Sequence, residues 1–455
     1  MQKHPDRHTY LTETPIPKLI PALAVPTIIS MLVTGIYNSA DTYFVGRIST
    51  EATAAVGLVF TVMALIQALG FFCGQGSANY LARLLGAGER QKANEVAVMG
   101  FAMAFVIGVL LAVFGNLEAD RLADWIGATS SSRPDTVAYM RIILLGAPFM
   151  TCQFVINNQL RFQGSAMYAM IGLMCGAVMN IALDPILMFG FGLGIRGAAI
   201  ATISGQFVSF VALFIGSRMG DNIRLSIHNL RPEPAYIASI AANGFPSLMR
   251  QGMAAVSTLL LNRYANFYGG DPAIAGMSIV SRILMLIMSA LVGFGQGYQP
   301  VCSYNYGAGL YARVKEGYRF CVKYGTVILA AFAALCLLFA EPVVGWFRED
   351  PDVVAVGAAA LRWQAAALPL MATSILTNMM MQATGKSLKS SITSSARNGI
   401  FFIPLILVLP RLFGLRGVEM TQAIADVLTF ILAVPMAYSE LRKMGGSASE
   451  TGRSA

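Results

Sequence analysis

The sequence predicts an all-α polytopic membrane protein, with about twelve transmembrane helices in two pseudo-symmetric lobes of six. The first reason is composition, because 56% of the residues are hydrophobic and only 12% are charged, whereas soluble proteins average about 25% charged residues. The second reason is that apolar stretches of about 20 residues recur, each long enough to cross a ~30 Å hydrocarbon core as a helix. The third reason is that the two halves of the chain resemble each other at a constant offset.

Hydropathy, with turns and charges as boundaries, divides each half into six spans. We expect an N-lobe over 18–217, a polar cytoplasmic linker over 218–234 and a C-lobe over 235–440. A polar segment, 1–17, precedes the first span, and a Gly/Ser-rich tail, 441–455, is expected to be disordered. The spans are expected near 18–45, 53–82, 94–117, 136–160, 165–190 and 195–217 in the first half, and near 236–266, 274–303, 317–340, 354–383, 388–410 and 416–440 in the second.

Basic residues gather on one side of the predicted membrane and are roughly half as frequent on the other. This distribution predicts a multi-pass protein of the cell (inner) membrane with both termini cytoplasmic, and no removable signal peptide is recognisable at the N-terminus. The formal net charge is +9, but the basic residues are dispersed rather than gathered into a patch with aromatic side chains. Nucleic-acid binding is therefore not expected.

The internal repeat has an offset of about 220 residues. It aligns Gly74-Gln75-Gly76 with Gly295-Gln296-Gly297, and Gly86-Ala87-Gly88 with Gly307-Ala308-Gly309, with the same spacing between the triplets in both copies. An even number of spans gives both halves the same topology, so a substrate cavity is expected between two lobes related by an axis along the membrane normal. The same offset, within a residue, pairs Pro26 with Pro246, Pro148 with Pro369, Gly164 with Gly385, and Arg196-Gly197 with Arg416-Gly417.

Two acidic residues of the first half lie in predicted spans and away from the span ends. Asp41 is in the first span, and Asp184 is in the fifth, four residues after Asn180, which places Asn180 and Asp184 on one helix face. Thr202 and Gln206 have the same spacing in the sixth span. Ionisable groups at membrane depth are expensive and usually functional, so Asp41, Asn180, Asp184 and Thr202 predict an oxygen-lined site for Na⁺ or H⁺. The alternative is that each acid caps local backbone or pairs with a basic neighbour.

These acids break the symmetry of the repeat. The offset carries Asp41 onto Asn262 and carries Asp184 into the acid-free stretch 403–405, and the seventh and tenth predicted spans contain no Asp or Glu. In the second half, Asp426 lies in the middle of the last span. Arg250 either lies in the cavity or extends to the cytoplasmic interface.

An adaptable substrate cavity is suggested by the 25 methionines, whose side chains are flexible and polarizable. For any one of them, ordinary core or lipid contact is the alternative. Enzymatic or ATP-driven activity is not expected, because the chain has three histidines, all outside the spans, and no HExxH, Walker A or Ser/His/Asp arrangement. No cofactor and no obligate protein partner are implied. The residues expected to line the cavity are Tyr37, Asn157, Met174, Gln206, Arg250, Met253, Met285 and Met288.

Together these features resemble the multidrug and toxic compound extrusion (MATE) family. The resemblance covers about residues 15–440 and rests on Pro26, the segment 37–46, the paired Gly-Gln-Gly and Gly-Ala-Gly motifs, and the segment 180–185. It implies a V-shaped twelve-helix antiporter that exports amphiphilic, often cationic compounds in exchange for H⁺ or Na⁺.

Within that family, acids in the seventh and tenth spans mark a branch that this sequence does not match. The chain looks like the DinF-like branch, in which an Asp of the first span and an Asn, Asp and Thr of the fifth and sixth form an N-lobe cation site. Asp41, Asn180, Asp184 and Thr202 match those positions by motif. The alternative is a lipid-linked oligosaccharide flippase of the same superfamily, for which Arg250 with Arg282 offers a weak cationic cavity.

Overall fold

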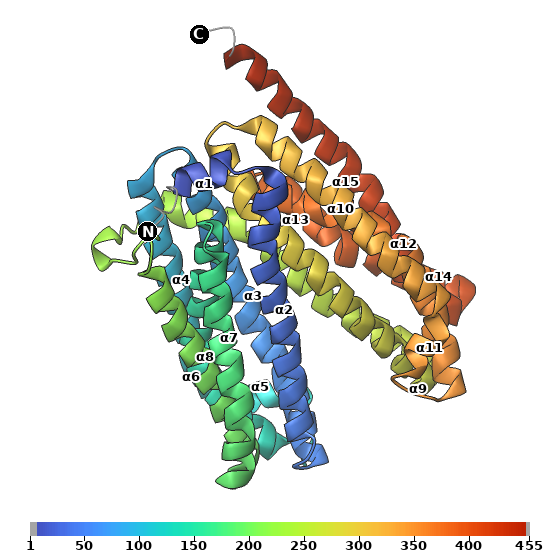
Figure 1. The fold of residues 1–455 in the computed structure, drawn as a ribbon. Coiled ribbons are helices and arrows are strands. Elements are labelled where there is room, and N and C mark those ends of the chain that lie inside the picture. The colour runs from blue at the N-terminus through green and yellow to red at the C-terminus, as the bar shows by residue number, and fades with distance from the viewer. Residues whose placement is uncertain (1–6, 452–455) are drawn as a thin grey trace. The chain divides into compact units, whose positions relative to one another are not determined.

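The computed structural model describes residues 7–451, and it leaves out the side chains of 38, 39, 42, 227 and 445–451. The first six residues of the expected N-terminal segment and the last four of the expected tail lie outside the described residues. The described part of the chain consists of helices and connecting turns, without a strand (Figure 1). Its first half contains α1 (Arg7–Glu13), α2 (Ile16–Val45), α3 (Thr50–Gly86), α4 (Arg90–Leu117), α5 (Ala119–Trp125), α6 (Arg133–Phe162), α7 (Ala166–Pro185), the π-helical turn η1 (Ile186–Gly190) and α8 (Gly194–Ser217).

The second half follows a short 3-10 turn, η2 (Ile227–Asn229), in the linker. It contains α9 (Pro234–Gly307), α10 (Tyr311–Leu338), α11 (Ala340–Gly345), α12 (Pro351–Ala383), α13 (Ser387–Ser395), the π-helical turn η3 (Ala396–Ile400), α14 (Phe402–Phe413) and α15 (Leu415–Thr451).

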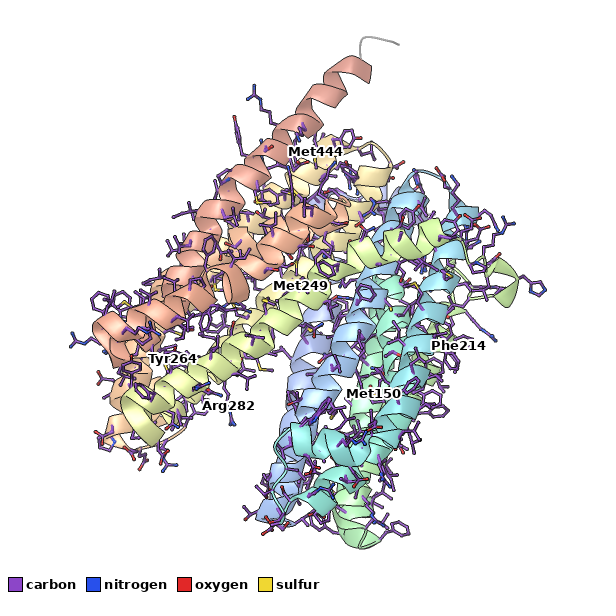
Figure 2. The ribbon with its side chains drawn as sticks, turned by 180° about the vertical axis from the view of Figure 1, so that it is seen from behind. Met150, Phe214, Met249, Tyr264, Arg282 and Met444 are labelled. Atoms are coloured by element: carbon purple, nitrogen blue, oxygen red, sulfur yellow. The ribbon has the colours of Figure 1, made fainter. Side chains whose placement is uncertain are left out.

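Eleven helical segments are long and apolar enough to cross a membrane. One of them, α9, has 74 residues, and a helix of that length would extend for about 110 Å, several times the thickness of a hydrocarbon core. Gly270 interrupts its helical backbone with φ 61° and ψ −155°, which only glycine adopts readily. Figure 2 shows Tyr264 and Arg282 on α9, one from each side of this break. The seventh and eighth predicted spans therefore both lie in α9, and the predicted all-α, twelve-span fold is confirmed.

The C-terminal end of α15 differs from the sequence prediction. Residues 441–455 were expected to be disordered, but α15 is helical through Thr451. Helix propagation adds one backbone hydrogen bond per residue once the preceding turns exist. Those turns are anchored because Glu440, which is 3% exposed in its side chain, forms ion pairs with Lys389 and Lys443.

The chain divides into two compact units. Unit 1 contains Val25–Gly244 together with α1 as far as Leu11, and unit 2 contains Thr12–Ala24 and the chain from Phe245 onward. The first nine residues of α2 thus belong with the second half, and the start of α9 belongs with the first. The expected lobes, 18–217 and 235–440, assign α2 to the first half and α9 to the second, whereas the observed units exchange the first part of each of these helices.

The Gly-Gln-Gly motifs make room for the exchanged helix ends. A methyl group on Gly76 of α3 would lie 2.2 Å from the carbonyl oxygen of Ile240, in the part of α9 that belongs to unit 1. A methyl group on Gly297 of α9 would lie 2.6 Å from Cα of Ala24, in the part of α2 that belongs to unit 2. Both distances are below any ordinary carbon contact, so glycine is needed at the equivalent position of each half because another backbone passes there.

Each unit has its own apolar core. In unit 1, α6 packs against α3, α4 and α8, and its buried side chains include Tyr139, Ile143 and Met150. Met150 is labelled in Figure 2. In unit 2, α12 packs against α10 and α15, and the core includes Leu361 and Leu368. The polar residues described below lie on helices that pack into these cores.

Candidate cation site

Three helices of unit 1 carry the residues predicted to bind a cation. Asp41 lies near the end of α2, Asn180 and Asp184 lie in the last two turns of α7, and Thr202 lies in the middle of α8. The α7 helix ends at Pro185, and the π-helical turn η1 follows it directly. Proline has no backbone N–H to donate, which explains why the regular hydrogen-bond pattern changes immediately after Asp184.

Glycines bring α7 and α8 close together at this site. A methyl group on Gly176 would lie 2.5 Å from the carbonyl oxygen of Gly205, and a methyl group on Gly205 would lie 2.7 Å from that of Gly176. The methyl group on Gly205 would also lie 2.9 Å from Cβ of Asn180. The two backbones therefore touch one turn before Asn180, and this contact places the Asn180–Asp184 face of α7 against α8.

Several polar atoms of the site residues are buried without hydrogen-bond partners. Asp184 is fully buried, Asn180 is 3% exposed and Thr202 is 4% exposed, while Asp41 is half-buried. Both carboxylate oxygens of Asp184, Oδ1 of Asp41, and both polar atoms of the Asn180 amide have no hydrogen-bond partner among the described residues. Leaving a buried polar group unsatisfied costs about 1–3 kcal/mol, and more for a charged one. The described residues thus leave these polar atoms of the candidate site uncompensated.

The two carboxylates lie within electrostatic range of each other, and the described Lys and Arg side chains form ion pairs with neither. Two like charges in a poorly solvated site repel, so a bound positive charge stabilises both. The alternative that each acid pairs with a basic neighbour is therefore not observed in unit 1.

Tyr139 belongs to this cluster and was missed by the sequence prediction. It is fully buried on α6, and its hydroxyl group lies among Asp41, Asp184 and Thr202 without meeting a partner in hydrogen-bonding geometry. Ser209, one turn after Gln206, likewise has an unpartnered buried hydroxyl. Nothing in the sequence distinguishes Tyr139 from other aromatic residues in apolar spans, because its place in the cluster depends on how α6 packs against α8.

The donor set is made of oxygen. The described residues contain no cluster of three or more His, Cys, Asp or Glu side chains that would suit a transition metal. Two carboxylates with neutral amide and hydroxyl oxygens suit a small, hard cation of low charge, or protons held on the carboxylates.

The expected cavity residues of unit 1 have different surroundings. The side chain of Tyr37 faces Gln206, and Oε1 of Gln206 is buried without a partner, so both adjoin the cation cluster. Met174 is half-buried on α7. The buried Nδ2 of Asn157 donates to the carbonyl oxygen of Ala169 at 3.1 Å and joins α6 to α7.

The expected cavity residues of unit 2 also differ from one another in exposure and in the residues they contact. Met288 is 9% exposed and lies within the apolar core of that unit. Met285, three residues earlier, is 60% exposed. Met253 packs beside Gly399 of η3, and Arg250 is half-buried with no ion pair among the described residues.

The internal repeat is visible as a shared hydrogen bond. Asn157 on α6 donates to Ala169 on α7, and Asn378 on α12 donates to the carbonyl oxygen of Ser390 on α13 at 2.8 Å. The two asparagines are separated by the repeat offset, and so are their acceptors. Equivalent helices of the two halves are therefore joined in the same way.

Comparison with known proteins agrees with this duplicated organisation. The MatE family model matches residues 26–186 and 245–408, one segment in each half. The chain belongs to the MatE family. It is thus a multi-pass membrane protein of a family of transport proteins.

Relatives of this MatE protein match it along nearly its whole length. The multidrug export protein MepA of Staphylococcus haemolyticus is 29% identical over 432 residues, which cover 94% of this chain and 95% of that protein. A crystal structure of MATE in the bent conformation has a TM-score of 0.92 at 27% identity, and covers 98% of this chain and 100% of that one. A MOP superfamily transporter from Pyrococcus furiosus, described as having a binding pocket of reverse polarity, has a TM-score of 0.90 at 26% identity, over 98% and 100% of the two chains.

Proposed function

We propose that this MatE protein is a secondary multidrug efflux antiporter that exports amphiphilic, often cationic compounds in exchange for H⁺ or Na⁺. The driving cation binds in unit 1 at Asp41, Asn180, Asp184 and Thr202. The observation that carries the proposal is a pair of membrane-depth carboxylates, half-buried Asp41 and fully buried Asp184, which lie within electrostatic range of each other without a basic partner. Export of drugs is supported by the name of the relatives, multidrug export protein MepA.

Coupling follows from linkage between the cation and the drug. Asp41 is on α2 and Asp184 is on α7, so a cation that binds both joins two helices that otherwise hold like charges near each other. A ligand shifts a conformational equilibrium only by its difference in affinity for the two states. Cation binding from outside therefore favours the state in which α2 and α7 are drawn together, and the exported compound must favour the other state.

The transporter is placed in the cell (inner) membrane with both termini cytoplasmic, as the distribution of Lys and Arg favours. Its partners are amphiphilic small molecules and membrane lipids. The proposed exchange requires no organic cofactor, no nucleic acid and no obligate protein partner.

The test is drug transport in proteoliposomes under separately imposed pH and Na⁺ gradients. Asp41→Asn and Asp184→Asn should each abolish gradient-driven efflux, because each removes one of the two carboxylates that bind the cation. Asp221→Asn is a matched control, since Asp221 is an exposed acid paired with Arg90 and should leave transport unchanged. Full gradient-driven efflux in both Asp41→Asn and Asp184→Asn would refute the assignment.

A second candidate is a lipid-linked oligosaccharide flippase, and one observation favours it. Arg250 is half-buried without an acidic partner, as an anionic headgroup would require. Arg282 lies on the same long helix α9 and is exposed (Figure 2). Translocation of a lipid-linked saccharide that is lost in Arg250→Gln, without gradient-driven drug efflux, would select this function.

A further inference from the structure

An internal ion pair lies at the end of unit 2 that corresponds to the cation cluster of unit 1. Nε of Arg397, in η3, lies 2.7 Å from Oδ1 of Asp426 in α15. The side chain of Asp426 is 3% exposed and that of Arg397 is 28% exposed. Gln422, one turn before Asp426, donates from Nε2 to the same carboxylate oxygen at 3.1 Å.

The repeat places α15 residues on those of α8. The pairing of Arg196-Gly197 with Arg416-Gly417 carries Thr202 onto Gln422 and Gln206 onto Asp426. Both pairs have the same spacing of one helical turn. The polar face that α8 presents to the cation cluster in unit 1 is thus the face that α15 presents to Arg397 in unit 2.

The repeat also relates α13 and η3 to α7. The pairing of Gly164 with Gly385, together with the shared Asn157 and Asn378 hydrogen bonds, carries Gly176 onto Arg397. Gly176 lies one turn before Asn180, on the helix face that continues to Asp184. In unit 1 a methyl group at this position would already meet Gly205 and Ser209, whereas in unit 2 a guanidinium group extends from it.

The two units therefore have opposite arrangements of charge at equivalent helices. In unit 1 the fifth span carries an acid, Asp184, that faces neutral residues of the sixth. In unit 2 the eleventh span carries a base, Arg397, that faces the acid Asp426 of the twelfth.

Arg397 is held where it meets the carboxylate. The hydroxyl group of Ser257, on α9, donates to the carbonyl oxygen of Asn398, the residue after Arg397. Met253, one turn earlier on α9, packs against Gly399. These contacts attach two adjacent residues of η3 to α9, so the position of Arg397 is set by unit 2 itself.

We infer that Arg397 is a built-in cation, and that Asp426 with Gln422 forms a second, latent cation site that Arg397 keeps filled. An acid that is 3% exposed is stabilised only when a positive charge or a proton accompanies it. Without Arg397, Asp426 must recruit a proton or Na⁺. The inference rests on the proposed function, because it contrasts the filled site of unit 2 with the cation site proposed in unit 1. It explains why the driving cation would bind in one lobe only.

The experiment uses the full-length protein in lipid nanodiscs, with Asp41→Asn and Asp184→Asn already in place so that the site in unit 1 is silent. Radiolabelled Na⁺ binding and proton uptake between about pH 9 and pH 5 are measured before and after adding Arg397→Met. Adding Arg397→Met should create uptake of about one further H⁺ or Na⁺ per chain. Adding Asp426→Asn as well should remove that uptake again.

Thermal unfolding provides a second measurement that does not depend on transport. In the same Asp41→Asn and Asp184→Asn background, the protein with Arg397→Met added should be stabilised by lowering the pH or adding Na⁺, because a ligand that binds the folded state raises its stability. Arg397→Met with Asp426→Asn should not respond, and should unfold at a higher temperature than Arg397→Met alone.

The inference is wrong if Arg397→Met, folded by its unfolding transition, takes up no additional cation and its stability does not respond to pH or Na⁺. That result would make the ion pair a purely structural contact. The proposed function is tested separately, because loss of cation uptake in Asp41→Asn and Asp184→Asn is measured with Arg397 intact.

Discussion

The hydroxyl group of Tyr236 donates to Oε2 of Glu95 at 2.8 Å. Tyr236 lies in the first turn of α9, and Glu95 is a 4% exposed residue of α4, so this bond attaches the start of the second half to unit 1. Arg231 of the linker contributes an ion pair to Oε1 of Glu95 at 3.3 Å. The exchange of helix ends between the units is thus anchored by a buried carboxylate, and not by apolar packing alone.

Loss of this bond is expected to destabilise unit 1. Tyr236→Phe should lower the free energy of unfolding by about 1.5–3 kcal/mol, the range for hydrogen bonds to charged groups. Thermal unfolding in detergent measures the effect. Tyr438→Phe is the control, because Tyr438 is 67% exposed and should unfold as the wild type does. An equal, small effect in both variants would show that the Glu95 bond is not an anchor.

Close contact between α7 and α8 is expected to be necessary for the cation site. Gly176→Ala should destabilise the protein by about 1–3 kcal/mol and weaken cation binding, because the added methyl group overlaps Gly205 and pushes the Asn180 face away. Radiolabelled Na⁺ binding and proton uptake report the site, and thermal unfolding reports the packing. Gly57→Ala, where a methyl group meets nothing within 4 Å, should preserve both. Normal cation binding in Gly176→Ala would contradict the role of the glycine contact.

The two equivalent asparagines, Asn157 and Asn378, should differ in how much they contribute to the free energy of unfolding. Asn157→Leu removes one hydrogen bond to the carbonyl oxygen of Ala169, at an expected cost of about 1–3 kcal/mol. Asn378→Leu should cost more, because Asn378 also lies within hydrogen-bond distance of the hydroxyl oxygens of Thr393 and Ser394. Chemical unfolding of the two variants in detergent compares the costs. A larger cost for Asn157→Leu than for Asn378→Leu would mean that the hydroxyl groups of Thr393 and Ser394 find other hydrogen-bond partners when the Asn378 amide is removed.

A surface carboxylate outside the spans predicts a small dependence of stability on pH. Oδ1 of Asp124, in α5, accepts a hydrogen bond from Nε of Arg133 at 2.7 Å, which lowers the pKa of Asp124 below its usual value. A carboxyl group whose pKa is lowered by folding stabilises the protein above its unfolded pKa of about 4, and this stabilisation is lost as the pH falls through the folded pKa.

Asp124→Asn should therefore lower the unfolding temperature slightly near neutral pH and have no effect in strong acid. The effect is small because both side chains are largely solvated. Unfolding temperatures measured across the acid range check this dependence. Arg133→Gln should remove the same pH-dependent part, and adding Asp124→Asn to it should change nothing further.

Much of the fold was predictable because its signals are local in sequence. The length and hydropathy of each span depend on consecutive residues, so most span boundaries agree with the observed helices within a few residues, although α15 extends well beyond the last predicted span. The short helices α5 and α11 were not predicted, since six or seven residues carry too little periodic pattern. The long helix α9 was predicted as two spans, which the positive φ of Gly270 explains.

The candidate site was predictable only in part. Acids at membrane depth stand out in any apolar sequence, so Asp41 and Asp184 were recognisable before their surroundings were known. Tyr139 was not recognisable, and the packing roles of Asn157 and Met288 were not either, because each depends on which neighbouring helix its side chain meets.

The sequence by itself determined the number of spans, the repeat and the confinement of paired acids to the first half, since all three are properties of residue order. Only the tertiary structure decided which backbones pass the Gly-Gln-Gly motifs, and that Asp426 has a partner in Arg397 whereas Asp184 has none. The physical reason is that a buried charge is defined by what surrounds it, and those neighbours come from helices far apart in the chain.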